Sequence, residues 1–407
     1  MKMKKSEKDR KHIVDGVIIS LILVFEVINS KLLIIFIPIL LLRILMYSKH
    51  FNNKLTVNSN TIWLILIFCL TTINGIRLYD NAQQFSIIYN SITFLNIILV
   101  QVLLSNDKRN IKKTLRVVVV ISTFILGFAI ILLEYKMILF RWSDFLNGNS
   151  GYRLGISSGI NPNAITWTFG FLALLTAYFI LFQKKYRFLP IYLIQIIIIL
   201  FTGSKNGFIL SFLPLLVYGI KSIKKINVFY LVLFITFFVI FWISIHKYPI
   251  MYTLIGKRID SMLYTLGLFH VKGNIDVGST EKRLNMISYA IKMFWQKPFI
   301  GWGIGAFAIL SGYGYYCHNN FMEILVSGGL FLFIIYYGFL FVKFINFILK
   351  NKDKDVLSLI LFLSLILLDF STVNFYSNIV FFLRTSIMLE LINLRGNEVI
   401  KSEKITN

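Results

Sequence analysis

Charged residues are scarce in this 407-residue sequence, and acidic residues are the scarcest of them. Only 15% of the residues are charged, 18 of them acidic and 42 basic, whereas soluble globular proteins are about 25% charged. This shortage excludes an ordinary soluble domain.

Cysteine is also rare: the sequence has Cys69 in an apolar run and Cys317 in a loop, so no disulfide framework is predicted.

Apolar residues take the place of the missing charge and make up 57% of the sequence. A helix needs about 20 mostly apolar residues to span a membrane, and about 17 at the low end. The sequence therefore predicts an all-α polytopic integral membrane protein, with about twelve transmembrane helices in a single membrane domain over residues 1–407. The expected spans, two of them short, are 13–29, 32–47, 60–76, 85–104, 117–133, 164–182, 188–202, 207–220, 227–245, 320–342, 356–370 and 376–393.

Basic residues are unevenly distributed among the segments between these spans. With the N-terminus inside, the inner segments hold 26 Lys and Arg and the short outer segments hold six. Lys and Arg accumulate in cytoplasmic loops, so both termini are predicted to be cytoplasmic. The net charge of +24 then reflects topology and does not call for nucleic acid as a partner. The basic start resembles a signal peptide, but no small-residue cleavage site follows, which indicates a retained first helix.

Two predicted outer loops, 134–163 and 246–319, are longer than a turn. The second contains the stretch STEKRLNMISYAIKMFWQKP, which predicts an amphipathic helix capped by Ser279 or Thr280 and ended by Pro298. Such a helix can lie on the membrane surface with its basic groups near lipid headgroups. Its expected apolar face consists of Leu284, Ile287, Ile291 and Phe294.

The stretch GWGIGAFAILSGYGYYCHNN ends this loop at His318 and Asn319. A neutral imidazole at the mouth of a span can take a proton from a hydroxyl, although a lone histidine can equally be satisfied at the interface. Gly303 and Gly305 would allow close approach of the backbone to a ligand. Tyr315 and Tyr316 fit either a sugar site or an aromatic belt.

Three cations that the topology places outside, Arg153, Lys205 and Arg283, could converge on a diphosphate. Taken singly, each also fits a snorkelling or solvated side chain. No metal site is predicted, because the external metal-ligating side chains lack ligand spacing such as His-x3-His. These are His246, His270, Asp276, Glu281 and His318.

Three blocks of the sequence carry a family resemblance: RLGISSGINPN, TGSKNGFI, and the long stretch from EKRLNM through PFIGWGIGAF to CHNNFMEILVSGGL. They resemble, in order, the Arg-x-x-Gly to Asn-Pro-Asn segment, the Thr-Gly-Ser-Arg-Gly turn and the His-Asn loop of the O-antigen ligase and polysaccharide polymerase superfamily, which includes the Wzy-type membrane glycosyltransferases. Ser204-Lys205 stands where the family has Ser-Arg, which keeps the charge but loses the bidentate fork.

The resemblance implies an enzyme of the bacterial inner membrane, with its site on the outer face and an oligosaccharide on undecaprenyl diphosphate as substrate. It implies that His318 is the base, that Asn319 orients the sugar or the histidine, and that Arg283, Lys205 and Arg153 bind the diphosphate. Sugar contacts would come from Asn163, Tyr315, Tyr316, Gly303 and Gly305. The reaction would invert the anomeric centre without metal or cofactor, with membrane lipid, a flippase and a chain-length regulator as partners.

Three functions are compatible with these residues. A polymerase of repeat units for capsule, exopolysaccharide or O-antigen is the reading we favour. A ligase that transfers the finished glycan differs from it only in the acceptor. A lipid-linked oligosaccharide flippase or transporter would call for charges through the spans and two similar halves, which the sequence lacks.

Overall fold

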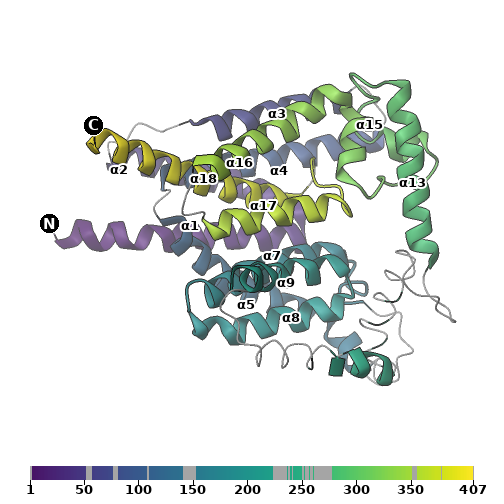
Figure 1. Cartoon of the computed structure of the whole chain (residues 1–407), viewed down its shortest axis with the longest axis horizontal. Coiled ribbons are helices and arrows are strands. Elements are labelled where there is room, and N and C mark those ends of the chain that lie inside the picture. Colours follow the sequence, from purple (N-terminus) through teal and green to yellow (C-terminus); the bar gives the residue numbers. More distant parts are fainter. Residues whose placement is uncertain are drawn as a thin grey trace. The chain divides into compact units, whose positions relative to one another are not determined.

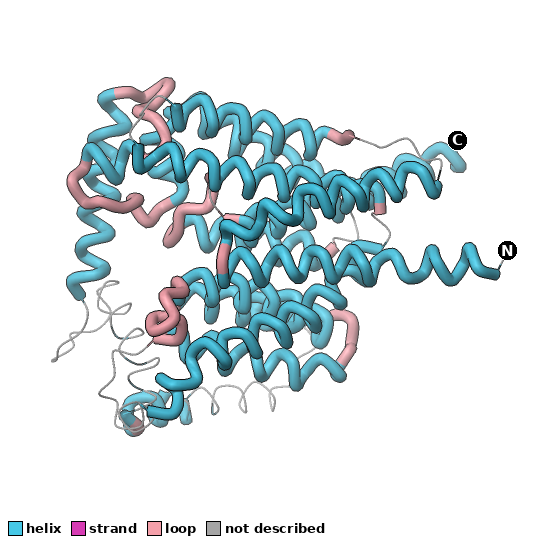
Figure 2. The backbone as a smooth tube through the Cα atoms, turned by 180° about the vertical axis from the view of Figure 1, so that it is seen from behind, coloured by secondary structure: helices cyan, strands magenta, loops and turns pink. Residues whose placement is uncertain are grey.

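The computed structural model describes residues 2–51, 57–76, 81–107, 110–140, 153–222, 236, 239–240, 242–249, 252, 256, 260, 277–350, 355–376 and 378–406. Throughout these residues the regular structure is helical, with no strand, as Figure 2 shows. The all-α prediction is confirmed for this part of the chain.

Five of the described helical segments are long and apolar enough to cross a membrane, namely Ser30–Ser48, Ile87–Asn106, Ile111–Lys136, Pro162–Leu181 and Asn320–Leu349. Shorter apolar helices cover Ser59–Gly75, Tyr186–Thr202 and Val356–Asp369. The chain is therefore a helical membrane protein. The number of twelve spans stays a prediction, and the expected span 227–245 lies mostly outside the described residues.

The chain divides into two compact units, of which unit 1 comprises residues 1–118 and 283–407. Its N-terminal helices are α1 (Lys2–Ile28), η1 (Ser30–Ile35), α2 (Phe36–Phe51), α3 (Ser59–Ile76) and α4 (Asn81–Asn106). Its C-terminal part holds α14 (Ala306–Leu310), α15 (Asn320–Phe333), the π-helix η6 (Ile334–Gly338), α16 (Phe339–Lys350), α17 (Val356–Asp369) and α18 (Ile379–Thr406), together with most of α13 (Val277–Gln296).

Unit 2 comprises residues 119–282. It contains most of α5 (Ile111–Phe140), then α7 (Pro162–Leu181), η3 (Tyr186–Phe188), α8 (Leu189–Thr202) and α9 (Lys205–Ser222). Helix α7 is its buried centre and packs against α8 and α9. Gly207 makes the α7–α9 contact close, since a Cβ there would lie 2.4 Å from Thr166 Cγ2. Small residues at helix contacts are typical of membrane bundles.

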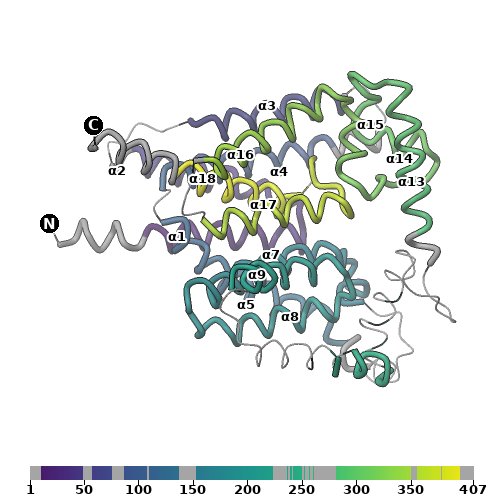
Figure 3. Tube along the Cα trace, viewed as in Figure 1, coloured from purple at the N-terminus to yellow at the C-terminus, as the bar shows by residue number. Residues whose placement is uncertain are grey.

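Helix α13 lies across one end of unit 1, next to the start of α15 (Figures 1 and 3). The chain termini lie at the opposite end of that unit. Which end faces the cytoplasm stays a prediction.

Helix α13 has a second apolar face besides the predicted one, and this second face packs on the rest of unit 1. Leu284 and Ile291 are exposed, whereas Met286, Ala290 and Met293 are buried against Phe307, Cys317 and Val326. The spacing of 4 and 3 is equally helical, so the pattern alone did not separate the two faces. The helix begins at Val277, before both predicted caps, and ends at Gln296 shortly before Pro298, as expected.

Helix α15 is broken at Gly329, where φ is 64° and ψ is −163°. The segment 298–303 lies against the break and pairs with its backbone. The bonds are Trp302 N to Val326 O (2.8 Å), Gly303 N to Ser327 O (2.8 Å), Leu330 N to Pro298 O (2.8 Å) and Phe331 N to Phe299 O (3.1 Å). Irregular backbone at membrane depth is tolerated only where protein satisfies it, and this segment satisfies it.

Replacing Gly329 by alanine should destabilise unit 1 strongly. The new Cβ would lie 2.3 Å from the carbonyl carbon of Phe299 and 2.4 Å from its oxygen, and its φ is left-handed, which costs a non-glycine residue about 1–2 kcal/mol. Gly312→Ala is the matched control, because Gly312 has a φ of 75° with nothing within 4 Å of its Cβ position. Thermal unfolding of the purified protein in detergent should show a larger loss for Gly329→Ala by about 1–3 kcal/mol. Equal losses would mean that the backbone pairing is loose.

Candidate functional site

His318 lies on a strained turn at the start of α15. Its φ is 58°, a left-handed conformation that is uncommon for residues other than glycine, although asparagine, aspartate and histidine are enriched in it. The turn is fixed on both sides: Cys317 N donates to Glu323 Oε2 (2.9 Å), and Asn319 Oδ1 caps α15 by accepting from Met322 N (3.0 Å). Backbone strain that the surroundings enforce is concentrated at functional sites.

Two tyrosines surround the imidazole of His318. The Tyr316 ring lies 4.6 Å from it and the Tyr315 ring 5.8 Å, centroid to centroid, both edge-on. His318 itself is half-buried. The ring is thus held in place by its neighbours and still open to a substrate on one side.

Arg283 lies near this turn. It is exposed on α13, whose buried Met286, Ala290 and Met293 pack on Cys317. Burial raises the pKa of the Tyr316 hydroxyl, and the positive charge of Arg283 opposes that rise. Because Tyr316 contacts His318, the field of Arg283 reaches the immediate surroundings of the histidine. The structure therefore brings Arg283 and His318 to one region of unit 1.

Unit 2 holds the other predicted cations around the Thr-Gly-Ser-Lys turn. Thr202 ends α8, Gly203 turns the chain with a φ of 62°, and Lys205 begins α9. Arg153 donates from Nε to Thr202 O (2.8 Å) and from Nη2 to Asn163 Oδ1 (3.1 Å). Arg153 and Asn163 thus hold the turn that precedes Lys205, a structural task that the sequence did not reveal.

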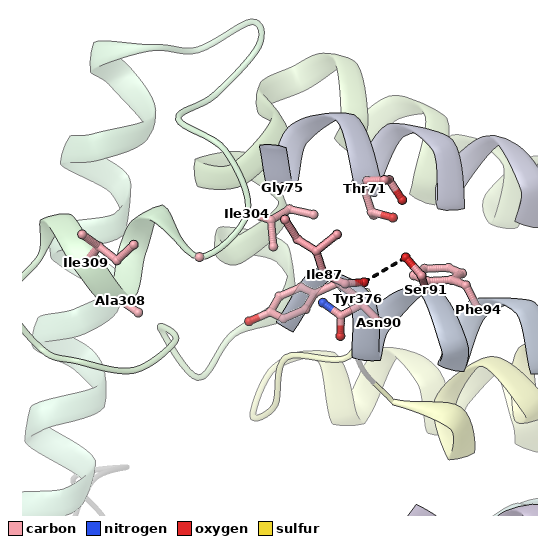
Figure 4. A pocket seen from close by; sticks show the side chains of 12 residues that line it. Thr71, Gly75, Ile87, Asn90, Ser91, Phe94, Ile304, Ala308, Ile309 and Tyr376 are labelled. Carbon is pink, nitrogen blue, oxygen red and sulfur yellow. Dashed lines mark hydrogen bonds between the residues drawn. The ribbon is translucent and has the colours of Figure 1, made fainter. Parts of the chain in front are cut away.

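The predicted site residues accordingly fall into two sets, each within one unit. In unit 1 are Arg283, Gly303, Gly305, Tyr315, Tyr316, His318 and Asn319, and in unit 2 are Arg153, Asn163 and Lys205. Gly303 is buried and bonded to the α15 break, whereas Gly305 lines a pocket shown in Figure 4. Among the described residues there is no group of three or more His, Cys, Asp or Glu that could hold a metal ion.

Glu323 is a residue that the sequence analysis missed. It lies in the first turn of α15, fully buried. Its Oε2 accepts from Cys317 N, and its Oε1 has no hydrogen-bond partner in the described structure. A carboxyl group inside a predicted span is a functional candidate by default, so its position in the sequence five residues after His318 was an available signal.

Glu323→Ala should loosen the turn that carries His318, because it leaves the buried Cys317 N–H unpaired at a cost of about 1–3 kcal/mol. Glu323→Gln retains an acceptor oxygen and should loosen it less. Cys317 itself reports the change: it is buried, and burial raises the pKa of its thiol, so it reacts slowly with maleimide. In a Cys69→Ser background, labelling of Cys317 should accelerate in Glu323→Ala. Unchanged labelling in both variants would show that Glu323 does not hold the turn.

A comparison with protein families agrees with this geometry. Residues 190–337 match the family model described as O-Antigen ligase (Wzy_C). The match includes the Thr-Gly-Ser-Lys turn, α13 and the His318 turn. No curated protein matches the chain. This match over residues 190–337 confirms the predicted resemblance to the O-antigen ligase and polymerase superfamily.

Proposed function

We propose that this protein is an inner-membrane glycosyltransferase that polymerises oligosaccharide repeat units carried on undecaprenyl diphosphate. The family model supports a membrane function of the O-antigen ligase or polymerase kind. The observation that carries the finer proposal is His318, held on a strained and doubly fixed turn within the field of Arg283. A base beside a cation is what transfer from a diphosphate carrier to a hydroxyl needs.

In the proposed reaction, His318 takes the proton of an acceptor sugar hydroxyl. The oxygen of that hydroxyl bonds to the anomeric carbon of the donor sugar, while the bond from that carbon to the diphosphate oxygen breaks. The diphosphate leaves with the electron pair, and the anomeric centre is inverted. The proposed role of Asn319 is to orient the histidine. Its side chain caps α15 and so fixes the backbone next to His318.

Arg283 is the proposed diphosphate ligand in unit 1, since a guanidinium can hold two phosphate oxygens at once. In unit 2 we assign the same task to Lys205, and to Arg153 the additional task of holding the turn before it. Lys205 is the first residue of α9. The amide groups of a helix N-terminus attract anions and repel cations, so a lysine placed there favours binding of an anion.

A ligase is the second candidate, because the matching family model is itself described as O-Antigen ligase. The two functions use the same residues and differ in the product. Incubation of the purified protein with lipid-linked repeat units alone should give a ladder of polymers if it is a polymerase. A ligase would give no ladder without a separate acceptor.

The role of His318 can be tested without disturbing the turn. Asparagine tolerates a left-handed backbone, and glycine adopts it without strain. His318→Asn and His318→Gly should therefore fold at least as well as the parent and lose about 10²–10⁴ of the rate, leaving single lipid-linked repeats. His12→Ala, a histidine of α1, is the control. Polymer ladders of normal length from a well-folded His318→Asn protein would contradict the assignment of the base.

Lys205 should act through its positive charge and not by transferring a proton. Lys205→Arg should keep much of the activity, whereas Lys205→Ala should lose about ten- to a hundredfold, the value of about 1.5–3 kcal/mol for a hydrogen bond to a charged group. Lys221→Ala, at the other end of α9, is the matched control. Initial rates of repeat-unit consumption in proteoliposomes measure the effect. A silent Lys205→Ala would leave diphosphate binding to the arginines.

A further inference from the structure

Unit 1 contains a pocket next to the His318 turn. It has a volume of about 160 Å³ and lies between the last turns of α3, residues 87–94 of α4, residues 304–309 and Tyr376. Figure 4 shows side chains from all four segments directed into one space, with the Tyr376 ring along one wall. The volume is close to that of a protein cavity of about 150 Å³ known to hold a benzene molecule. One six-membered ring is therefore the size of guest that fits.

The pocket is lined mostly by apolar surface, together with the hydroxyls of Thr71, Thr72 and Ser91 and the amide of Asn90. Thr71 and Thr72 on α3 donate to Phe68 O (2.9 and 2.8 Å), and Ser91 on α4 donates to Ile87 O (2.8 Å). Each of these hydroxyl protons is committed to a helix carbonyl, so each oxygen presents its remaining lone pair as an acceptor. Phe94 and Ile304 complete the lining with apolar surface. Sugars offer this combination of outward hydroxyls and apolar ring faces.

The pocket is fixed to the histidine turn through Asn320. Its Oδ1 accepts from the backbone N–H of Asn374 (2.8 Å) and of Phe375 (3.2 Å). These bonds hold the segment that leads into Tyr376 against the start of α15, two residues after His318. Tyr376 thus belongs to the surroundings of the His318 turn and to the pocket wall.

We propose that this pocket binds the terminal sugar ring of the acceptor glycan, whose attacking hydroxyl is deprotonated by His318. The proposal rests on the proposed glycosyltransferase function and adds an acceptor subsite to it. Thr71, Thr72 and Ser91 accept hydrogen bonds from ring hydroxyls, while Phe94 and Tyr376 contact the ring. A segment of the polyprenyl tail is the competing guest, which would use the apolar lining and leave the three hydroxyl oxygens unused.

Protection of an introduced cysteine measures occupancy without turnover. The protein carries Ala308→Cys on the pocket wall, Cys69→Ser to remove the exposed native thiol, and His318→Asn to prevent reaction. The probes are the lipid-linked repeat unit and undecaprenyl diphosphate without sugar. The repeat unit should slow labelling by N-ethylmaleimide, and the bare carrier should not. Leu310→Cys, exposed on the same short helix and outside the pocket, should be labelled at the same rate throughout.

Isosteric removal of a pocket hydroxyl gives a kinetic test in the His318-containing enzyme. Thr71→Val should raise the KM for the acceptor, the substrate that keeps its lipid carrier, about fivefold with little change in kcat, as expected for one lost hydrogen bond. The KM for the donor should not change. Thr176→Val is the matched control, since Thr176 is a buried helical threonine of unit 2 that likewise donates to a carbonyl one turn back (2.7 Å).

The outcomes separate this proposal from the function on which it rests. Equal protection by the bare carrier would assign the pocket to the polyprenyl tail and overturn the acceptor subsite. Absence of protection by either probe, or an unchanged acceptor KM in Thr71→Val, would overturn it as well. In each of these cases a loss of polymerisation in His318→Asn would still support the glycosyltransferase. Failure of the His318-containing protein to consume lipid-linked repeat units, with or without a separate acceptor, would refute the function itself.

Discussion

The broken backbone of α15 is the constraint on which the site in unit 1 depends. Peptide groups that leave a helix at membrane depth must find partners within the protein, at a cost of several kcal/mol for each one left unpaired. At Gly329 those partners come from residues 298–303, the segment that joins α13 to α14. The pairing fixes both ends of the His318 loop, because the loop leaves from Gly303 and returns at Asn319. The glycines of this loop suggest a flexible segment, but its backbone is tightly constrained.

Three neighbouring polar residues then fix the position of the histidine within this constrained segment. Asn319 caps α15, Asn320 holds the segment before Tyr376, and Glu323 holds the backbone of Cys317. Asn320 also donates to the Tyr337 hydroxyl (2.9 Å), which donates in turn to Asp369 (2.6 Å). Buried polar networks that are well satisfied make a site rigid. The strain at His318 persists because its neighbours on both sides are bonded to other parts of the fold.

The helices and the position of the site could be predicted from the sequence, and the orientation of side chains could not. Eleven of the expected spans fall on described helices, because length and apolar content decide whether a segment can cross a membrane. For α13 the predicted apolar face is one of two, since Met286, Ala290 and Met293 repeat with the same helical period as Leu284 and Ile291. Periodicity shows that a stripe exists, whereas the segments that cover it come from elsewhere in the chain. Glu323 could have been noticed as a carboxyl inside a predicted span, but its partner, the backbone N–H of Cys317, is encoded by no side-chain pattern.

Charge placement in unit 2 completes the physical case for an anionic substrate. Lys205 begins α9, where the helix dipole disfavours a cation by about 0.3–1 kcal/mol, and Arg153 is bonded to the end of α8 just before it. In the proposed function the same lysine and the same amide groups would attract a bound diphosphate. On this proposal the position of Lys205 serves the binding of an anion, as the turn of His318 serves the reaction.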